Sequence, residues 1–270
     1  MSGEPAGGQP HDSDEQKPST TILAEQIEEG MNQLTRSVDG LFLSGLSAGL
    51  DIGFGPLLMV VLLTLVGDTW GEPATRILLA NAYTVGFVFV ILGRSELFTE
   101  HTTLAVLPVL DRRAALSDLG RVWGVVFTAN VVGGALFAGL AVAAAPAFGI
   151  AELSAFTEIA KPLVDHGFLE LLVGAILAGW LMGLLSWLVT AAQETTGRML
   201  VVWIVTVTIG LAHLPHCIAG NVEVLAAVFA GGIDLAQYAR FMTAATIGNV
   251  LGGTTFVALL KYGHVVRGGQ

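Results

Sequence analysis

Residues 94–102 read RSELFTEHT and place polar side chains inside a segment, 75–110, that is otherwise largely apolar. A membrane-spanning helix needs about 20 apolar residues, so this segment is too long for one straight span. A second long segment, 199–230, is interrupted in the same way by HLPH at 213–216. Each segment predicts a broken helix, and the alternative is a continuous helix that simply ends earlier. Because unpaired backbone in lipid is tolerated only where it is buried in protein or lines a cavity, the two breaks predict a pore.

The composition predicts a membrane protein. Of the 270 residues, 53% are hydrophobic and 13% are charged, and the mean hydropathy is +0.72. A soluble domain carries about a quarter charged residues. The pattern predicts an all-α membrane protein with six transmembrane helices. The six apolar segments are 41–66, 75–110, 121–145, 168–192, 199–230 and 240–262.

Charged and reactive residues exclude several classes of protein. Residues 1–40 hold eight acids against two bases, and so carry −6 of the net charge of −10. Nothing concentrates basic charge on a face that would bind nucleic acid. The only cysteine, Cys217, cannot form an internal disulfide. The sequence shows neither a paired nucleophile and base nor a phosphate-binding glycine loop, which argues against an enzyme and against an ATP-driven pump.

Four regions are expected along the chain. Residues 1–21 form a disordered acidic tail, 22–38 an amphipathic interfacial helix, 39–263 the transmembrane channel domain and 264–270 a C-terminal tail. The amphipathic helix lies at the membrane surface or against the bundle, and a soluble linker helix is the alternative. Basic residues concentrate on the side of the two tails, which predicts a protein of the cell (inner) membrane with both termini in the cytoplasm.

The two halves of the chain resemble each other. Residues 130–134 (NVVGG) match residues 249–253 (NVLGG) at an offset of 119. Residues 48–53 and 178–183 share Ala-Gly followed by Gly, at an offset of 130. Three spans in each half force the halves into opposite orientations. The expected fold is therefore two inverted three-helix repeats, with broken helices 2 and 5 and the site at their pseudo-twofold axis.

Two residues at the breaks are candidates for a substrate site. A half-helix that restarts after a break presents free N–H groups and a positive dipole end, and two such ends favour an anion. Thr99 and His216 are placed to donate hydrogen bonds there. His216 is also able to exchange a proton with a weak-acid substrate; the alternative is a neutral ring that only bonds the backbone. His213, one turn earlier, is a partner of His216 or a helix-end residue.

The other residues of the first break have alternative interpretations. Glu96 is expected to cap free N–H groups of the break rather than to carry charge through the pore. Glu100 and His101 guard a vestibule at one mouth, or else form a solvated pair. Leu97 and Phe98 form a hydrophobic constriction, or else pack as ordinary helix residues.

These residues resemble the formate/nitrite transporter family of pentameric anion channels over about residues 38–262. The resemblance implies an aquaporin-like fold, one pore in each protomer and a homopentamer in the lipid bilayer. It implies that His216 is the central pore histidine with Thr99 beside it, and that Leu97 and Phe98 help to form the constriction. The similar stretches are GLSAGLDIGFG at 45–55, ELFT at 96–99, AGWL at 178–181 and HCIA at 216–219.

Several positions depart from the family pattern around the expected site. An extra residue, Gly220, precedes Asn221, which we include among the pore residues. Lys161 is the only candidate for the lysine that the family has near the outer mouth of the fourth span. The other departures are Glu100 and His101 for Gly-Asn, Pro215 for an acid, and Gly179 for Asn.

The leading hypothesis is a channel or transporter for a small monovalent anion such as formate, nitrite or hydrosulfide. A neutral-solute or water channel is the alternative, because an inverted repeat with two half-helices also serves those solutes. A third hypothesis is an intramembrane metal-dependent enzyme built from His213, His216, His101 and Glu100, although an HxxH spacing on a helix is common by chance. The leading hypothesis involves no metal, cofactor or catalytic residue, and its partners are the anion, lipid and further copies of the chain.

Overall fold

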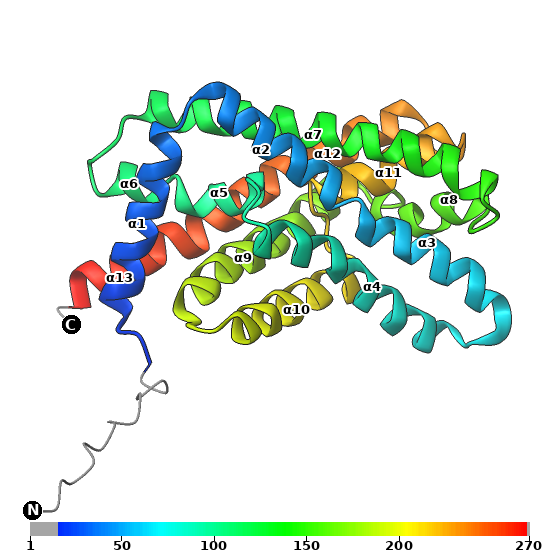
Figure 1. Cartoon of the computed structure of the whole chain (residues 1–270), viewed down its shortest axis with the longest axis horizontal. Helices are drawn as coiled ribbons and strands as arrows, with labels where there is room; N and C mark the ends of the chain where they lie inside the picture. Colours follow the sequence, from blue (N-terminus) through cyan, green and yellow to red (C-terminus); the bar gives the residue numbers. More distant parts are fainter. Residues whose placement is uncertain (1–15, 269–270) are drawn as a thin grey trace, which may run out of the picture.

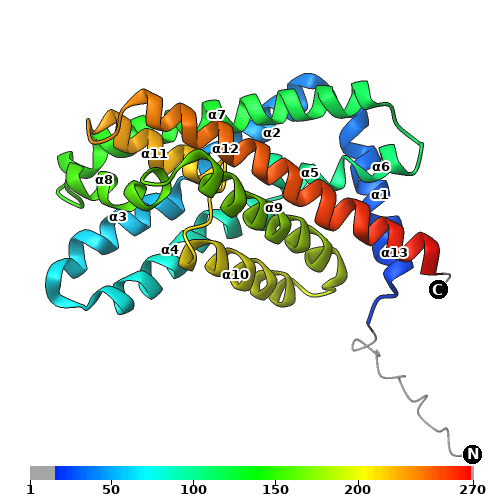
Figure 2. The same cartoon turned by 180° about the vertical axis from the view of Figure 1, so that it is seen from behind.

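The computed structural model of the protein describes residues 16–268, and within this range every regular element is helical (Figures 1 and 2). The first half contains α1 (Ser19–Thr35), α2 (Val38–Asp51), α3 (Phe54–Val66), the 3₁₀ turn η1 (Gly67–Thr69), α4 (Glu72–Leu92), α5 (Phe98–Leu104), α6 (Leu107–Leu110) and α7 (Leu116–Ala147). The second half contains α8 (Leu153–Val164), α9 (Phe168–Ala191), α10 (Thr195–Leu211), α11 (Ala219–Phe229), α12 (Leu235–Leu251), the π-helical η2 (Gly252–Leu259) and α13 (Leu260–Gly268).

Among the described residues, five helical stretches are long and apolar enough to cross a membrane. The segment expected at 199–230 is divided between α10, with 17 residues, and α11, with 11 residues. Neither helix alone reaches the length of a span. The five stretches are Val38–Val66, Glu72–Leu92, Leu116–Ala147, Phe168–Ala191 and Leu235–Gly268.

The chain leaves helical geometry at the two places where polar residues interrupt the apolar segments. Residues 93–97, which we call the first connection, separate α4 from α5. Residues 212–218, the second connection, separate α10 from α11. Arg94 and His213 have positive φ angles of 56° and 48°, in a region that residues other than glycine seldom adopt. Both connections therefore need support from the surrounding helices.

Close packing at glycines holds two equivalent pairs of helices together. α2 packs against α7, and α9 packs against α12. A Cβ atom at Gly49 would lie 2.3 Å from the carbonyl oxygen of Asn130, and one at Gly179 would lie 2.2 Å from that of Asn249. Only a residue without a side chain permits this approach, as in other membrane bundles. Matching residues of the sequence repeat thus make matching contacts.

Shorter helices cover the two ends of the bundle. α1 packs beside α6 and α13 at one end, and α8 packs against α3 and α11 at the other (Figure 1). One face of α1 is buried, so this helix lies against the bundle, which is one of the two positions expected for it. The sequence predicts no helix between the third and fourth spans, yet α8 lies there because its apolar face finds a partner in α11.

Three boundaries differ from the predicted ones. The interfacial helix predicted at 22–38 is α1, which both starts and ends three residues earlier. The C-terminal tail predicted from residue 264 is helical as far as Gly268. Of the acidic tail predicted at 1–21, residues 1–15 lie outside the described residues. The last three residues, 19–21, belong to α1.

We predict that Gly133→Ala destabilises the bundle, whereas Gly120→Ala on the same helix does not. A Cβ atom at Gly133 would lie 2.4 Å from the carbonyl oxygen of Leu46, but one at Gly120 meets nothing within 4 Å. Overpacking of this kind costs about 1–3 kcal/mol, while alanine in an open helix position is favourable. The melting temperature of the purified protein in detergent should fall for Gly133→Ala only. Equal melting temperatures would contradict the packing argument.

Candidate functional site

Asn130, on α7, satisfies the backbone of the first connection. Its Oδ1 accepts a hydrogen bond from the N–H of Phe98 at 2.8 Å. Its Nδ2 donates to the carbonyl oxygens of Glu96, at 2.9 Å, and Gly45, at 2.7 Å. One buried amide thus pairs a carbonyl group of the first connection, the first N–H of α5 and a carbonyl group of α2, as burial in a membrane requires.

Asn249, on α12, does the same for the second connection. Its Oδ1 accepts from the N–H of Cys217 at 2.8 Å. Its Nδ2 donates to the carbonyl oxygens of Pro215, at 2.9 Å, and Ala175, at 2.8 Å. These partners lie at the offsets of 119 and 130 that relate the two halves of the sequence. The two connections are held by the same set of hydrogen bonds.

Thr99 and His216 meet between the two connections. Oγ1 of Thr99, in the first turn of α5, lies 2.9 Å from Nε2 of His216, and both side chains are buried. Nδ1 of His216 accepts from the N–H groups of Ile218, at 3.3 Å, and Ala219, at 3.1 Å. The neutral ring therefore carries its hydrogen on Nε2 and donates it to Thr99. The hydroxyl hydrogen of Thr99 remains available for another acceptor.

Two adjoining cavities lie on the α8 side of this pair. The α8 vestibule, as we call the larger, has a volume of about 390 Å³. The central cavity, of about 20 Å³, shares His213 with the vestibule and reaches His216; a volume of this size holds about one water molecule. The polar residues of the α8 vestibule are Glu72, Thr75, Arg76, Glu158 and His213, and those of the central cavity are Tyr83, His213, His216 and Glu223.

Another cavity, which we call the α1 vestibule, lies at the first connection and has a volume of about 440 Å³. It is formed by α1, the first connection, the start of α5 and the adjoining ends of α4, α9 and α10. Among the described residues, acidic side chains outnumber arginines in both vestibules, by four to two in the α1 vestibule and by two to one in the α8 vestibule. The charged residues of the α1 vestibule are Glu25, Glu29, Arg94, Glu96, Glu100 and Arg198.

One face of α4 runs from one vestibule to the other. Ala80 lines the α8 vestibule, Tyr83 the central cavity and Ile91 the α1 vestibule. The ring of Phe87 lies edge-on to that of His216, with 5.1 Å between the centroids. The spacing of three or four residues places all four α4 side chains on one face. At 1.5 Å per residue, Ala80 and Ile91 lie roughly 16 Å apart along the helix, and the Thr99–His216 pair lies between them.

The sequence predicts that Glu96 caps free N–H groups of the first connection, but in the structure Asn130 bonds these groups instead. The carboxylate instead pairs with Arg36, just after α1, and lies 2.5 Å from Nε2 of His101 in α5. Glu96 is only 7% exposed and His101 is buried, so this charged cluster ties the end of α1 to the first connection. Glu100 lines the α1 vestibule, in agreement with the vestibule position that the sequence predicts for it.

Leu97 and Phe98, the predicted constriction, are both buried. The ring of Phe98 packs against α7, with its centroid 4.9 Å from that of Phe127 and 6.1 Å from that of Trp123. Neither Leu97 nor Phe98 lines the vestibules or the central cavity. This geometry matches the packing interpretation, and a constriction at these residues stays a prediction.

Two other predicted pore residues lie apart from the Thr99–His216 pair. Asn221, on α11, accepts from the hydroxyl of Tyr238 at 2.7 Å and donates to the carbonyl oxygen of Val131 at 3.2 Å. It therefore joins α11 to α12 and α7. Lys161 is exposed on α8 and does not line the α8 vestibule. His213, by contrast, is half-buried and lines both the vestibule and the central cavity.

Glu223 is a site residue that the sequence analysis missed. It lies on α11, is 4% exposed and lines the central cavity together with His216. The available signal was a single acid within an apolar helix, since an ionisable residue at membrane depth is costly. The roles of Asn130 and Asn249 were also missed, although both head the repeated NVxGG motif.

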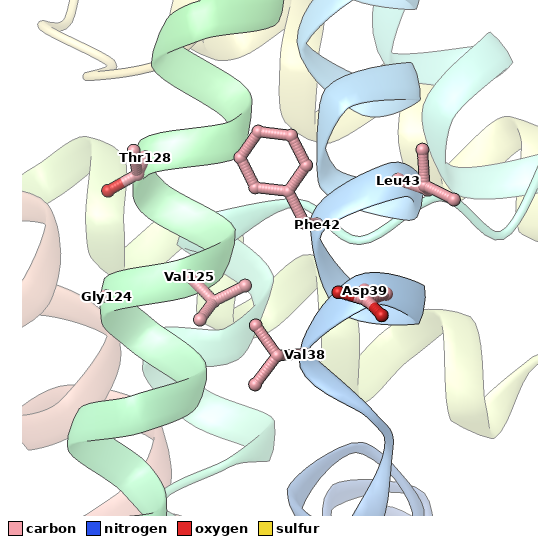
Figure 3. A pocket seen from close by; sticks show the side chains of 7 residues that line it. All are labelled: Val38, Asp39, Phe42, Leu43, Gly124, Val125 and Thr128. Carbon is pink, nitrogen blue, oxygen red and sulfur yellow. The ribbon is translucent and has the colours of Figure 1, made fainter.

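The hypothesis of a metal-dependent enzyme requires a cluster of metal ligands. Within residues 16–268, no three His, Cys, Asp or Glu side chains lie close enough together to hold a metal ion. A further, mainly apolar cavity of about 630 Å³ lies between α2 and α7 (Figure 3). In it, Phe42 lies across the gap between the helices and Val38 faces Val125. This cavity shares no lining residue with either vestibule and is therefore separate from the Thr99–His216 site.

A helical bundle with five candidate spans, two vestibules and a buried polar pair between them defines a membrane channel or transporter. The sequence model described as "Formate/nitrite transporter" matches residues 20–263. The chain belongs to the formate/nitrite transporter family and is an integral membrane protein.

Similar proteins agree with this assignment. "Inner membrane protein YfdC" of Escherichia coli (strain K12) is 31% identical over 242 residues, which cover 88% of this chain and 76% of that protein. "Formate channel BtFdhC" of Bacillus thuringiensis is 26% identical over 245 residues, covering 87% and 91%. Transporters and channels, rather than enzymes, are the functions named among such relatives.

Two solved structures have the same fold. A structure titled "FNT family ion channel" matches with a TM-score of 0.79 and 20% identity, covering 92% of this chain and 99% of the other. A structure titled "Pentameric formate channel with formate bound" matches with a TM-score of 0.71 and 23% identity, covering 85% and 98%. The all-helical fold expected from the sequence is thereby confirmed at the level of the family.

We predict that Asn130→Ala lowers stability and abolishes transport. The substitution leaves the N–H of Phe98 and the carbonyl oxygen of Glu96 without their partner, and each unsatisfied buried group costs about 1–3 kcal/mol. Melting in detergent and solute uptake by proteoliposomes measure the two effects. Asn32→Ala, at an exposed position of α1, is the control and should change neither. A stable, active Asn130→Ala protein would show that the first connection does not need this amide.

Proposed function

We propose that this chain is a channel or transporter for a small monovalent anion, of the kind of formate, nitrite or hydrosulfide. The observation that carries the proposal is the Thr99–His216 hydrogen bond, buried between two vestibules at opposite ends of α4. A buried hydroxyl with an available hydrogen is a suitable donor to an anion. Formate is named for one relative and one similar structure, and the chain shares their family.

The architecture that we propose is a pair of inverted three-helix repeats. In it, α4 and α5 form one broken span, and α10 and α11 form the other. The equivalent hydrogen bonds of Asn130 and Asn249 support this assignment. So does the equivalent packing of α2 on α7 and of α9 on α12. By analogy with the pentameric structure, the chain forms a homopentamer. The Thr99–His216 pair lies within a single chain, which supports one pore per protomer, and the basic residues on the side of the two tails support cytoplasmic termini.

We also propose that His216 exchanges a proton with a weak-acid substrate through Thr99. The substrate oxygen accepts from the Thr99 hydroxyl, and the ring holds that hydroxyl in place by donating from Nε2. A second proton on the ring requires Nδ1 to release the N–H groups of Ile218 and Ala219. The neutral form of a weak acid then crosses the apolar surroundings that exclude its ion.

A neutral solute is the second candidate substrate. The observation that favours it is the excess of carboxylates in both vestibules, which repel free anions. A weak acid that crosses as the neutral species fits the same charge pattern. Formate and water therefore have to be compared directly.

We predict that proteoliposomes containing the chain take up radiolabelled formate faster than protein-free vesicles, and increasingly so as the external pH falls from 7.5 to 5.5. Protonation of formate favours crossing, which gives this direction. Stopped-flow shrinkage of the same vesicles measures water permeability. Rapid water flow without formate uptake would replace the anion proposal with the neutral-solute one.

We predict that His216→Leu still assembles and loses the pH-dependent part of formate uptake. Its stability should fall, because the N–H groups of Ile218 and Ala219 lose their acceptor. Leucine fills a similar volume, yet it cannot donate to Thr99 or take up a proton. The measurement is initial uptake at several external pH values, with assembly checked by size-exclusion chromatography. Wild-type rates at every pH would remove His216 from the mechanism.

A further inference from the structure

Glu223 is a buried acid that has no part in the Thr99–His216 hydrogen bond, yet it has the features of a functional residue. Its side chain is 4% exposed, and it lines the central cavity beside His216. Within residues 16–268 no hydrogen bond or ion pair engages its carboxyl group, whereas the other deeply buried acid, Glu96, has two basic partners. A buried carboxyl group without a partner is retained at a cost, which suggests a function.

The hydrogen bonds of His216 make it a less suitable proton donor than Glu223. Both ring nitrogens are engaged, Nε2 with Thr99 and Nδ1 with two backbone N–H groups. The ring can therefore take up a second proton only by breaking hydrogen bonds that hold the second connection. A carboxyl group without competing partners gains and loses a proton without that rearrangement.

We propose that Glu223 is the residue that gives the proton to the substrate, at the α8 side of the Thr99–His216 pair. This inference rests on the proposed transport of a small anion, and it assigns the proton exchange to Glu223 instead of His216, whose ring then orients the Thr99 hydroxyl. Carboxylic acids of this kind are effective general acids when a substrate oxygen lies within hydrogen-bond reach.

Among the described residues, no lysine or arginine lines the cavity that Glu223 shares with His216. Tyr83 from α4 and His213 and His216 from the second connection line the same cavity. Cys217 is buried next to His216, while α3 and α8 contribute only Met59 and Leu163 to the cavity wall. The charged residues Glu72, Arg76 and Glu158 line the α8 vestibule, which shares His213 with the central cavity.

The proposed step balances in atoms and charge. The O–H bond of the Glu223 carboxyl group breaks and an O–H bond forms on formate, which leaves a Glu223 carboxylate and neutral formic acid. The acid passes the Thr99 hydroxyl and releases its proton to water in the α1 vestibule. Water in the α8 vestibule returns a proton to Glu223. Each formate that crosses therefore carries one proton with it.

The experiment uses proteoliposomes loaded with a pH-sensitive dye, so that formate uptake and internal acidification are recorded together. In the wild type, uptake should be accompanied by acidification beyond that of protein-free vesicles. Glu223→Gln keeps the size and polarity of the side chain but cannot release a proton in this way. It should lower uptake at pH 7 by about tenfold or more and abolish the protein-dependent acidification.

Three comparisons make the result specific. Glu223→Asp retains an acid and should recover part of both signals. Glu28→Gln, at an exposed position of α1, is the matched control and should behave as wild type. Thr99→Val removes the hydroxyl but keeps Glu223, so it should slow uptake while the remaining uptake stays coupled to protons.

Two outcomes would overturn the role of Glu223 while leaving the proposed transport of a small anion intact. One is a Glu223→Gln protein with wild-type uptake and acidification. The other requires no variant: wild-type uptake of formate without acidification would show that the anion crosses alone. A wild-type protein that takes up no formate at all would instead contradict the proposed function.

Discussion

A peptide group inside a bilayer has to find its hydrogen-bond partner within the protein, and two asparagines supply the partners where this chain is not helical. Asn130 and Asn249 each pair a carbonyl of one connection and an N–H in or directly after it, and each also donates to a neighbouring helix. The connections can therefore lie buried at membrane depth, where they bring Thr99 against His216. Glycines at the α2–α7 and α9–α12 contacts allow the backbones to approach closely enough for these bonds.

The charged residues of the two vestibules bear on the proposed passage of a weak acid. Acidic side chains outnumber arginines in both vestibules, and the most deeply placed acids differ in their surroundings. Glu96 is compensated by Arg36 and His101, so it acts as a structural charge that fixes the first connection. Glu223 has no arginine or histidine paired with its carboxyl group among the described residues, and it lines the central cavity instead. A weak acid is the kind of substrate for which this difference matters.

The sequence located both connections because polar residues inside an apolar segment are conspicuous. It also identified Thr99 and His216 as residues that meet between the two breaks, because both are hydrogen-bonding side chains at interruptions of apolar segments. It assigned the capping of the first connection to Glu96, which was the nearest polar side chain in the chain. The partner is Asn130, 32 residues beyond Phe98, and such a distant contact leaves no local signal. Asn221 was likewise placed in the pore, although its hydrogen bonds join helices.

Hydropathy and the repeated motifs were enough to determine a helical membrane protein, the location of its interruptions and the equivalence of its halves. These features depend on the period and length of apolar segments, which are local properties of a chain. The partners of each buried polar group depended on which helices pack together, and only the tertiary structure decided that. Glu223 illustrates the difference, because its position on α11 is an ordinary helical one. Only the packing of α11 against α7 and α8 places its side chain in the wall of the central cavity, together with His216.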